Sequence, residues 1–161
     1  MKKTAAILLA IMTALFAFAA SAETVSISVP SPGASYSLSE SGGTYTITPK
    51  DDTGSAYAQQ MTITQYESVS ASDRKSAALK ELKGSFSSVT AYSRSVKIFG
   101  SIDAIFITAN DAVSDEIPFT DVYIADNGLG GCIEVRIRYS SLTATGFASD
   151  MCALLSSITA E

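Results

Sequence analysis

The chain has 161 residues, with 11 lysine and arginine residues against 16 aspartate and glutamate residues, and it contains no histidine and no tryptophan. Without histidine, the chain cannot build a Ser-His-Asp or Cys-His catalytic centre, a histidine-ligated zinc site or a histidine-ligated haem site. For this length we expect a single domain of ordinary size.

The N-terminus has the features of a secretory signal peptide. A pair of lysines precedes a largely apolar run over residues 5–20, and Ala20-Ser21-Ala22 matches a small-residue cleavage site. The run of 16 residues is shorter than a membrane-spanning helix, which needs about 20. We therefore expect residues 1–22 to be cleaved and residues 23–161 to form one exported bacterial domain, periplasmic or secreted.

Cleavage would make the chain more acidic. Removing the 22 residues, two of which are lysines, leaves 139 residues with 9 basic and 16 acidic side chains, a net charge of −7. A strongly acidic chain without a cluster of lysine and arginine argues against nucleic acid or an anionic bilayer as partner. No second apolar stretch is long enough to span a membrane, so we expect no membrane span after cleavage.

Alternating apolar and polar residues predict several strands in the first half of the mature chain. The pattern covers Thr24–Val29, which Pro30 ends, then Thr44–Thr48 and Ala58–Tyr66. Tyr36 and Leu38 indicate a further short strand.

From Ser70 to Lys83 the pattern changes, and good helix formers predict a helix. Ser70 or Ser72 can serve as N-cap, and Gly84 can end the helix. The narrow apolar stripe expected on this helix comprises the stem of Lys75 with Ala78, Leu79 and Leu82.

The second half predicts four strands and a C-terminal helix. The helix runs from about Thr143 to Thr159, and its apolar side chains recur at helical spacing. The expected strands are Val96–Phe99, Ile102–Ala109, Phe119–Ala125 and Cys132–Tyr139.

Strands grouped apart from helices imply an α+β fold, with a mainly antiparallel sheet, one mid-chain helix and a C-terminal helix packed on the sheet. The C-terminal helix should cover the face that carries Ile133, Val135 and Ile137. Leu154→Asp or Val135→Asp is expected to unfold the domain, because either change buries an unpaired charge. The apolar face of the C-terminal helix comprises Phe147, Met151, Leu154, Leu155 and Ile158.

The order of elements resembles the PsbP-like fold family, which includes exported bacterial proteins and lumenal proteins of photosystem II. The resemblance rests on a first strand that ends in Pro30, on Ile98-Phe99-Gly100 before a strand with Ala104, on the hairpin Val122–Ile137, and on the last helix. An aromatic residue common after the first proline is absent. The resemblance implies a fold and adaptor or assembly roles, and it implies no activity.

Cys132 and Cys152 could form a disulfide in an exported chain. Strand and helix rises place Cys152 ~10 Å short of Cys132 along the strand, whereas a disulfide needs Cα atoms within ~7 Å of each other. Alternation also turns Cys132 away from the Ile133 face. A bulge at Gly130-Gly131 or a steep helix crossing would allow the bond. The alternative is two separate thiols.

Glu134, Arg136 and Arg138 share the strand face opposite Ile133. This face is either a solvated sheet surface with cross-strand pairs or a binding face in which arginine recognises carboxylates or phosphates.

The densest acidic stretch matches no calcium-binding loop, so its side chains are interpreted as solvated charges, and we expect no metal and no cofactor. The stretch comprises Asp111, Asp115, Glu116, Asp121 and Asp126.

The leading hypothesis is an exported, non-enzymatic domain that binds a protein or another envelope component. The alternative is a carrier that holds a small ligand between sheet and helix. The weakest hypothesis is an enzyme that uses carboxylates alone, which needs two carboxylates facing each other across a cleft.

Overall fold

The computed structural model describes residues 25–51, 59–111, 118–140 and 144–160, so the predicted signal peptide lies outside the described residues. Within the described residues, the chain forms one large antiparallel sheet, two helices and a small two-stranded sheet. This arrangement confirms the predicted α+β fold.

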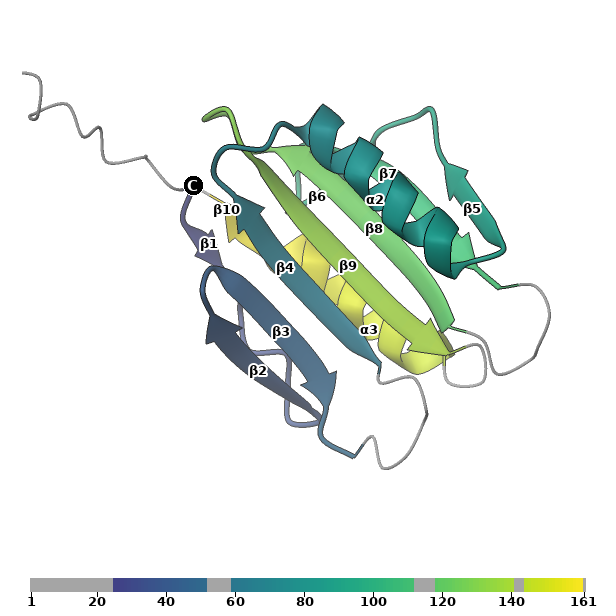
Figure 1. Cartoon of the computed structure of the whole chain (residues 1–161). Coiled ribbons are helices and arrows are strands. Elements are labelled where there is room, and N and C mark those ends of the chain that lie inside the picture. The colour runs from purple at the N-terminus through teal and green to yellow at the C-terminus, as the bar shows by residue number, and fades with distance from the viewer. Residues whose placement is uncertain (1–24, 52–58, 112–117, 141–143, 161) are drawn as a thin grey trace, which may run out of the picture.

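The large sheet has the strand order β2-β3-β4-β9-β8-β7-β5, and β6 also pairs with β7. Every neighbouring pair of strands is antiparallel, as Figure 1 shows. Strand β9 therefore lies in the interior of the sheet, between β4 and β8. The strands are β2 (Tyr36–Ser41), β3 (Thr44–Pro49), β4 (Gln60–Tyr66), β5 (Ser88–Ala91), β6 (Val96–Ile98), β7 (Ile102–Asn110), β8 (Pro118–Asp126) and β9 (Cys132–Ser140).

The two helices, α2 (Ala71–Ser85) and α3 (Ala144–Ser157), lie on opposite faces of the sheet (Figure 1). Beneath α3, a cluster of buried apolar residues includes Val135 of β9 and Met151 of the helix. Beneath α2, a second cluster includes Leu82 of the helix and Val122 of β8. The predicted packing of the C-terminal helix on the Ile133, Val135 and Ile137 face is confirmed.

Helix α2 begins at the predicted N-cap, because the side chain of Ser70 accepts the N–H of Asp73 at 3.1 Å. Gly84 does not end the helix as predicted. The helix continues to Ser85, and the N–H of Phe86 donates to the carbonyl of Leu82 at 2.8 Å.

The buried stripe of α2 is also rotated from the predicted one. It consists of Arg74, Ala78 and Leu82, whereas Lys75 and Leu79 are only partly buried. These three buried positions are four residues apart, so they lie above one another on one side of the helix. The first residue of this buried stripe, which faces the sheet, is thus the charged Arg74.

Two strands were not predicted. Strand β5 pairs with the edge of β7, and β10 (Thr159–Ala160) pairs with β1 (Ile27–Ser28) next to the C-terminus (Figure 1). Strand β1 is shorter than the predicted N-terminal strand. Both strands that form the small sheet have only two residues, too few to show a period in the sequence.

The hairpin between β8 and β9 fixes which residues of β9 face α2. The side-chain oxygen of Asn127 accepts the N–H groups of Leu129 and Gly131, each at 2.9 Å. A Cβ atom on Gly131 would lie 2.1 Å from the carbonyl oxygen of Tyr66, so a larger residue would push β4 and the hairpin apart. The hairpin lies in the predicted loop and holds β9 in register with both neighbours.

The two cysteines are not bonded to each other in the structure. Cys132 is buried beneath α2, whereas Cys152 is exposed on α3, which covers the other face of the sheet. The hypothesis of a Cys132–Cys152 disulfide is therefore wrong, and the alternative of two separate thiols holds, because alternation along β9 turns Cys132 toward α2 while Cys152 lies on α3 at the other face. Burial raises the pKa of Cys132 to about 11.

In the part of the chain that is described, neither helix has the length and hydrophobicity required to cross a membrane.

Candidate functional site

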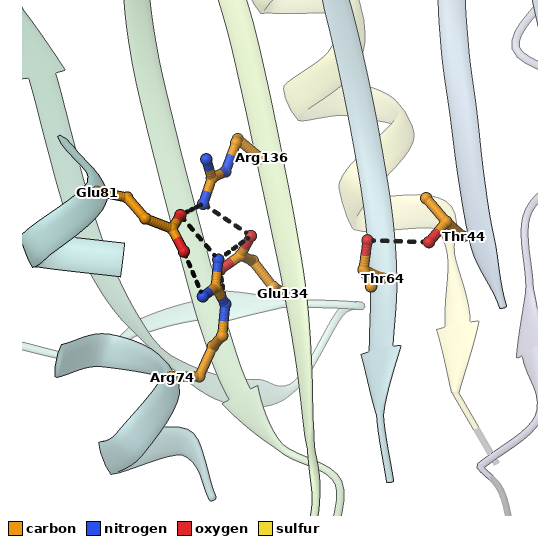
Figure 2. Close-up of polar contacts among 6 residues, drawn as sticks. All are labelled: Thr44, Thr64, Arg74, Glu81, Glu134 and Arg136. Atoms are coloured by element: carbon orange, nitrogen blue, oxygen red, sulfur yellow. Dashed lines mark hydrogen bonds and ion pairs between the residues drawn. The ribbon is translucent and has the colours of Figure 1, made fainter. Parts of the chain in front are cut away.

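Four charged side chains meet between α2 and β9, where Figure 2 shows them facing one another. We call Arg74, Glu81, Glu134 and Arg136 the ion-pair cluster. Arg74 and Glu81 project from one side of the helix because they are two turns apart. Glu134 and Arg136 are two residues apart on β9, so alternation directs both toward the helix.

Both carboxylates of the ion-pair cluster contact both guanidinium groups, through hydrogen bonds or ion pairs (Figure 2). Arg74 donates to Glu134 at 2.6 and 3.2 Å and to Glu81 at 2.9 and 3.1 Å. Arg136 Nη2 lies 3.0 Å from a carboxylate oxygen of Glu81 and 3.0 Å from one of Glu134. Two positive and two negative groups thus balance one another.

The burial of the four side chains differs strongly, and the difference determines their roles. The side chains of Glu134 and Arg74 are 5% and 10% exposed, whereas that of Glu81 is 48% exposed. The Arg74 guanidinium also lies 5.1 Å above the ring of Tyr66, within the range of a cation–π contact. The buried part of the ion-pair cluster is therefore a structural connection between helix and sheet, and its outer part faces solvent.

Hydrogen bonds from Arg74 and Arg136 lower the pKa of Glu81 to about 2, against a partial desolvation effect in the other direction. Because the pKa in the folded chain lies below the unfolded value of 4.5, ionised Glu81 stabilises the fold above that pH. The contribution is lost as the pH falls from about 4.5 toward about 2.

We expect Glu81→Gln to reduce the steepness with which stability falls in acid. The urea midpoint of the wild type should exceed that of Glu81→Gln near pH 6, and the gap should close below pH 3. Solvent screening at this half-exposed side chain keeps the gap small. Urea unfolding curves across this range test the expectation, and a constant gap between the two proteins would contradict it.

A pocket of about 330 Å³ adjoins the ion-pair cluster, between the C-terminal half of α2 and strands β8 and β9. We call it the α2 pocket. This volume is at the lower end of the range typical of small-molecule sites. It is lined by Glu81, Leu82, Ser85, Phe86, Asp111, Thr120, Arg136 and Arg138.

Two polar side chains of the α2 pocket have no partner among the described residues. The hydroxyl of Thr120 is buried, with the residue 2% exposed, and it makes no hydrogen bond. Arg138, its cross-strand neighbour on β9, forms no ion pair or hydrogen bond with the described part of the chain. A buried hydroxyl without a partner costs about 1–3 kcal/mol, which a ligand in the pocket could recover.

The predicted binding face of Glu134, Arg136 and Arg138 is divided by helix α2. The three side chains share one face as predicted, but Glu134 is 4% exposed beneath the helix, so it cannot contribute to an open surface. Arg136 joins the ion-pair cluster, and Arg138 lines the α2 pocket. The alternative of a solvated face with cross-strand pairs also needs correction, because the carboxylate partners include Glu81 of the helix.

The described members of the acidic stretch, Asp111, Asp121 and Asp126, do not gather around one point. The Asp111 carboxylate accepts from the Ser87 hydroxyl, Asp126 accepts a backbone N–H of the hairpin, and Asp121 accepts from Tyr139 on the opposite face of the sheet. Asp115 and Glu116 lie outside the described residues. Among the residues that the structure places, no group of three or more acidic, cysteine or histidine side chains could hold a metal ion.

Sequence reasoning missed Arg74, Glu81, Asp111 and Thr120 as members of this region. Arg74 carries a signal in retrospect, since it precedes Ala78 by four residues and Leu82 by eight, and so lies on the apolar stripe of its helix. Thr120 gives no such signal, because a threonine in a strand is ordinary in any sheet.

Comparison with known proteins gives a likeness of fold. No protein-family model matches the chain, and no curated protein matches it. The structure is similar to the crystal structure of LpqN, which is involved in cell envelope biogenesis of Mycobacterium tuberculosis, with a TM-score of 0.62 and 9% sequence identity. The similarity covers 85% of this chain and 84% of LpqN. At this identity the likeness shows a shared fold alone.

Proposed function

We propose that the chain is an exported, envelope-associated domain that binds a ligand and does not catalyse a reaction. The observation that carries the proposal is the contrast between the two parts of the site. Every charge of the ion-pair cluster is paired with opposite charges inside the cluster, whereas Arg138 and Thr120 of the adjoining α2 pocket lack partners among the described residues.

The state of Glu81 supports binding over acid–base catalysis. A general acid must hold its proton near the working pH, and Glu81 with a pKa of about 2 releases its proton far below neutrality. The second carboxylate of the ion-pair cluster, Glu134, is covered by α2 and paired with Arg74 and Arg136. It therefore does not face Glu81 across an open cleft. This arrangement disfavours the hypothesis of an enzyme that uses carboxylates alone.

Envelope association draws on two observations. The first residues resemble a secretory signal peptide, and the fold is shared with LpqN, a protein of cell envelope biogenesis. The PsbP-like resemblance agrees with the same fold class and stays a prediction. Between the two binding hypotheses, the α2 pocket favours the carrier, because it lies between sheet and helix where the alternative hypothesis placed a ligand.

The test is a thermal-shift screen of the protein exported from a full-length precursor, with its N-terminus sequenced. We expect the mature chain to begin at Glu23, and a ligand in excess of its Kd to raise the melting temperature by several degrees. Arg138→Gln should abolish that shift. Arg94→Gln, which removes the same charge at an exposed position outside the pocket, should preserve it.

Two outcomes would overturn the proposal. Retention of the uncleaved chain in the cytoplasm would exclude export. Turnover of a screened compound that disappears in Glu81→Gln would show catalysis. If no compound shifts the melting temperature while Arg138→Gln still binds a specific envelope protein, the carrier hypothesis is wrong and the adaptor hypothesis replaces it.

A further inference from the structure

The floor of the α2 pocket spans three neighbouring strands, and its charges are separated across them. Arg138 lies on β9, its cross-strand partner Thr120 lies on β8, and Asp111 directly follows β7 on the far side of β8. A cation and an anion thus lie on opposite sides of a buried hydroxyl. No ion pair joins Arg138 to Asp111.

We infer that the α2 pocket binds a small zwitterion, an α-amino acid or a similar compound, with its carboxylate at Arg138 and Thr120 and its ammonium group at Asp111. The inference rests on the proposed binding function and names the ligand class.

Arg138 is the guanidinium that is free to receive a carboxylate. The planar fork of an arginine donates two parallel hydrogen bonds to a carboxylate. In Arg136, one nitrogen of that fork already contacts both Glu81 and Glu134. Rotation of Thr120 about its side-chain bond would turn its unpartnered hydroxyl toward the same carboxylate, which adds a third donor.

The other side of the α2 pocket suits a cation. Asp111 accepts one hydrogen bond from Ser87, which leaves acceptor sites on its carboxylate for an ammonium group. Ser87 follows the end of α2, so the last carbonyl groups of that helix, which carry partial negative charge, lie on this side. A dianion such as phosphate would meet both Asp111 and Glu81, whereas a zwitterion carries no net charge.

The apolar part of the pocket wall is formed by Leu82 and Phe86 near the end of α2. These side chains give the carbon chain of an amino acid a surface to contact. The volume of about 330 Å³ accommodates a ligand of this size.

The experiment compares three probes that share one carbon skeleton: norleucine, hexanoate and hexylamine, each titrated calorimetrically into the mature protein. We expect norleucine to bind most tightly. Arg138→Gln should lower the affinity for norleucine and for hexanoate by about tenfold or more, because a pair of charge-assisted hydrogen bonds is lost. Thr120→Val should weaken both several-fold without lowering the melting temperature, because it removes an unsatisfied hydroxyl.

The decisive variant is Asp111→Asn, because it should weaken the binding of norleucine but not that of hexanoate. It should lower the affinity for norleucine to the level of that for hexanoate. The affinity for hexanoate should stay unchanged or rise, because a negative charge that repels the carboxylate is removed. Arg94→Gln should alter none of the affinities. Equal binding of hexanoate and norleucine by the wild type, or preferential binding of hexylamine, would overturn the zwitterion inference.

Failure of the inference can be told apart from failure of the proposed function. If none of the three probes binds to the wild type, the inference is wrong. The proposed function then still holds if a compound of different chemistry shifts the melting temperature in an Arg138-dependent way.

Discussion

Val135→Asp is expected to abolish cooperative folding. Val135 is fully buried at the centre of β9, between Ile63 of β4 and Tyr123 of β8, and it packs in the cluster beneath α3. The change removes about 1.5–3 kcal/mol of apolar burial and places a carboxylate where it has no cation. The effective cost of a buried charge is several kcal/mol, so the two losses together approach the whole stability of a typical domain, about 5–15 kcal/mol.

Far-UV circular dichroism with thermal and urea denaturation measures this effect. Thr90→Asp is the matched control, because it introduces the same carboxylate into an exposed position of the edge strand β5. Leu154→Asp should destabilise less than Val135→Asp, since Leu154 is 9% exposed and a helix side chain at the rim of the core can reach water. An unchanged melting temperature for Val135→Asp would mean that α3 does not pack on this face.

The sequence could predict those parts of the fold that have a clear period. Strand β9 alternates over its whole length, and α3 carries apolar residues at helical spacing, so both elements and their mutual packing were foreseen. In α3 one side of the helix is buried and the other is exposed, whereas in β9 the alternation separates the apolar side chains that face α3 from the charged side chains that face α2. Strands β5 and β10 lack such a contrast, since they are short edge strands with exposed positions.

The candidate site was predicted in part. The alternation of β9 placed Glu134, Arg136 and Arg138 on one face, which is correct. It could not show that Arg74, 60 residues earlier in the chain, pairs with Glu134. The contact between Arg74 and Glu134 depends on where α2 crosses the sheet. The pattern of residues within each element does not determine that position.

The apolar stripe predicted for this helix does not include Arg74, because charged residues in helices are usually exposed. Its burial is explained by the two carboxylates that it contacts. A buried arginine is tolerated only when its charge is compensated. The position of Arg74 at the end of the apolar stripe of α2 therefore indicates a buried carboxylate partner. The candidates in the sequence are the acidic residues on strand faces, among them Glu134.

Glu134→Gln is expected to destabilise the domain by about 3–5 kcal/mol, the usual cost of breaking a buried ion pair by removing one partner. The amide has nearly the same shape, so packing is preserved and the loss is electrostatic. Arg74, only 10% exposed, and Arg136 would then share the single carboxylate of Glu81. Urea unfolding at pH 7 gives the free energy directly from midpoint and slope.

Glu81→Gln is the matched control at the exposed end of the ion-pair cluster, where the expected loss is only about 0–1 kcal/mol. Salt should reduce the effect of Glu81→Gln and leave that of Glu134→Gln nearly unchanged, because buried pairs are screened little.

The double variant Arg74→Met with Glu134→Met distinguishes the effect of mutual charge compensation between the two side chains from the effect of their packing. It removes both buried charges and fills their space with flexible apolar side chains, so it should be more stable than either single variant. Arg136 and Glu81 keep their own contact, 3.0 Å between nitrogen and oxygen, in that protein. If the losses of the two single variants simply add in the double variant, Arg74 and Glu134 are not energetically coupled, and the buried half of the ion-pair cluster does not connect α2 to the sheet.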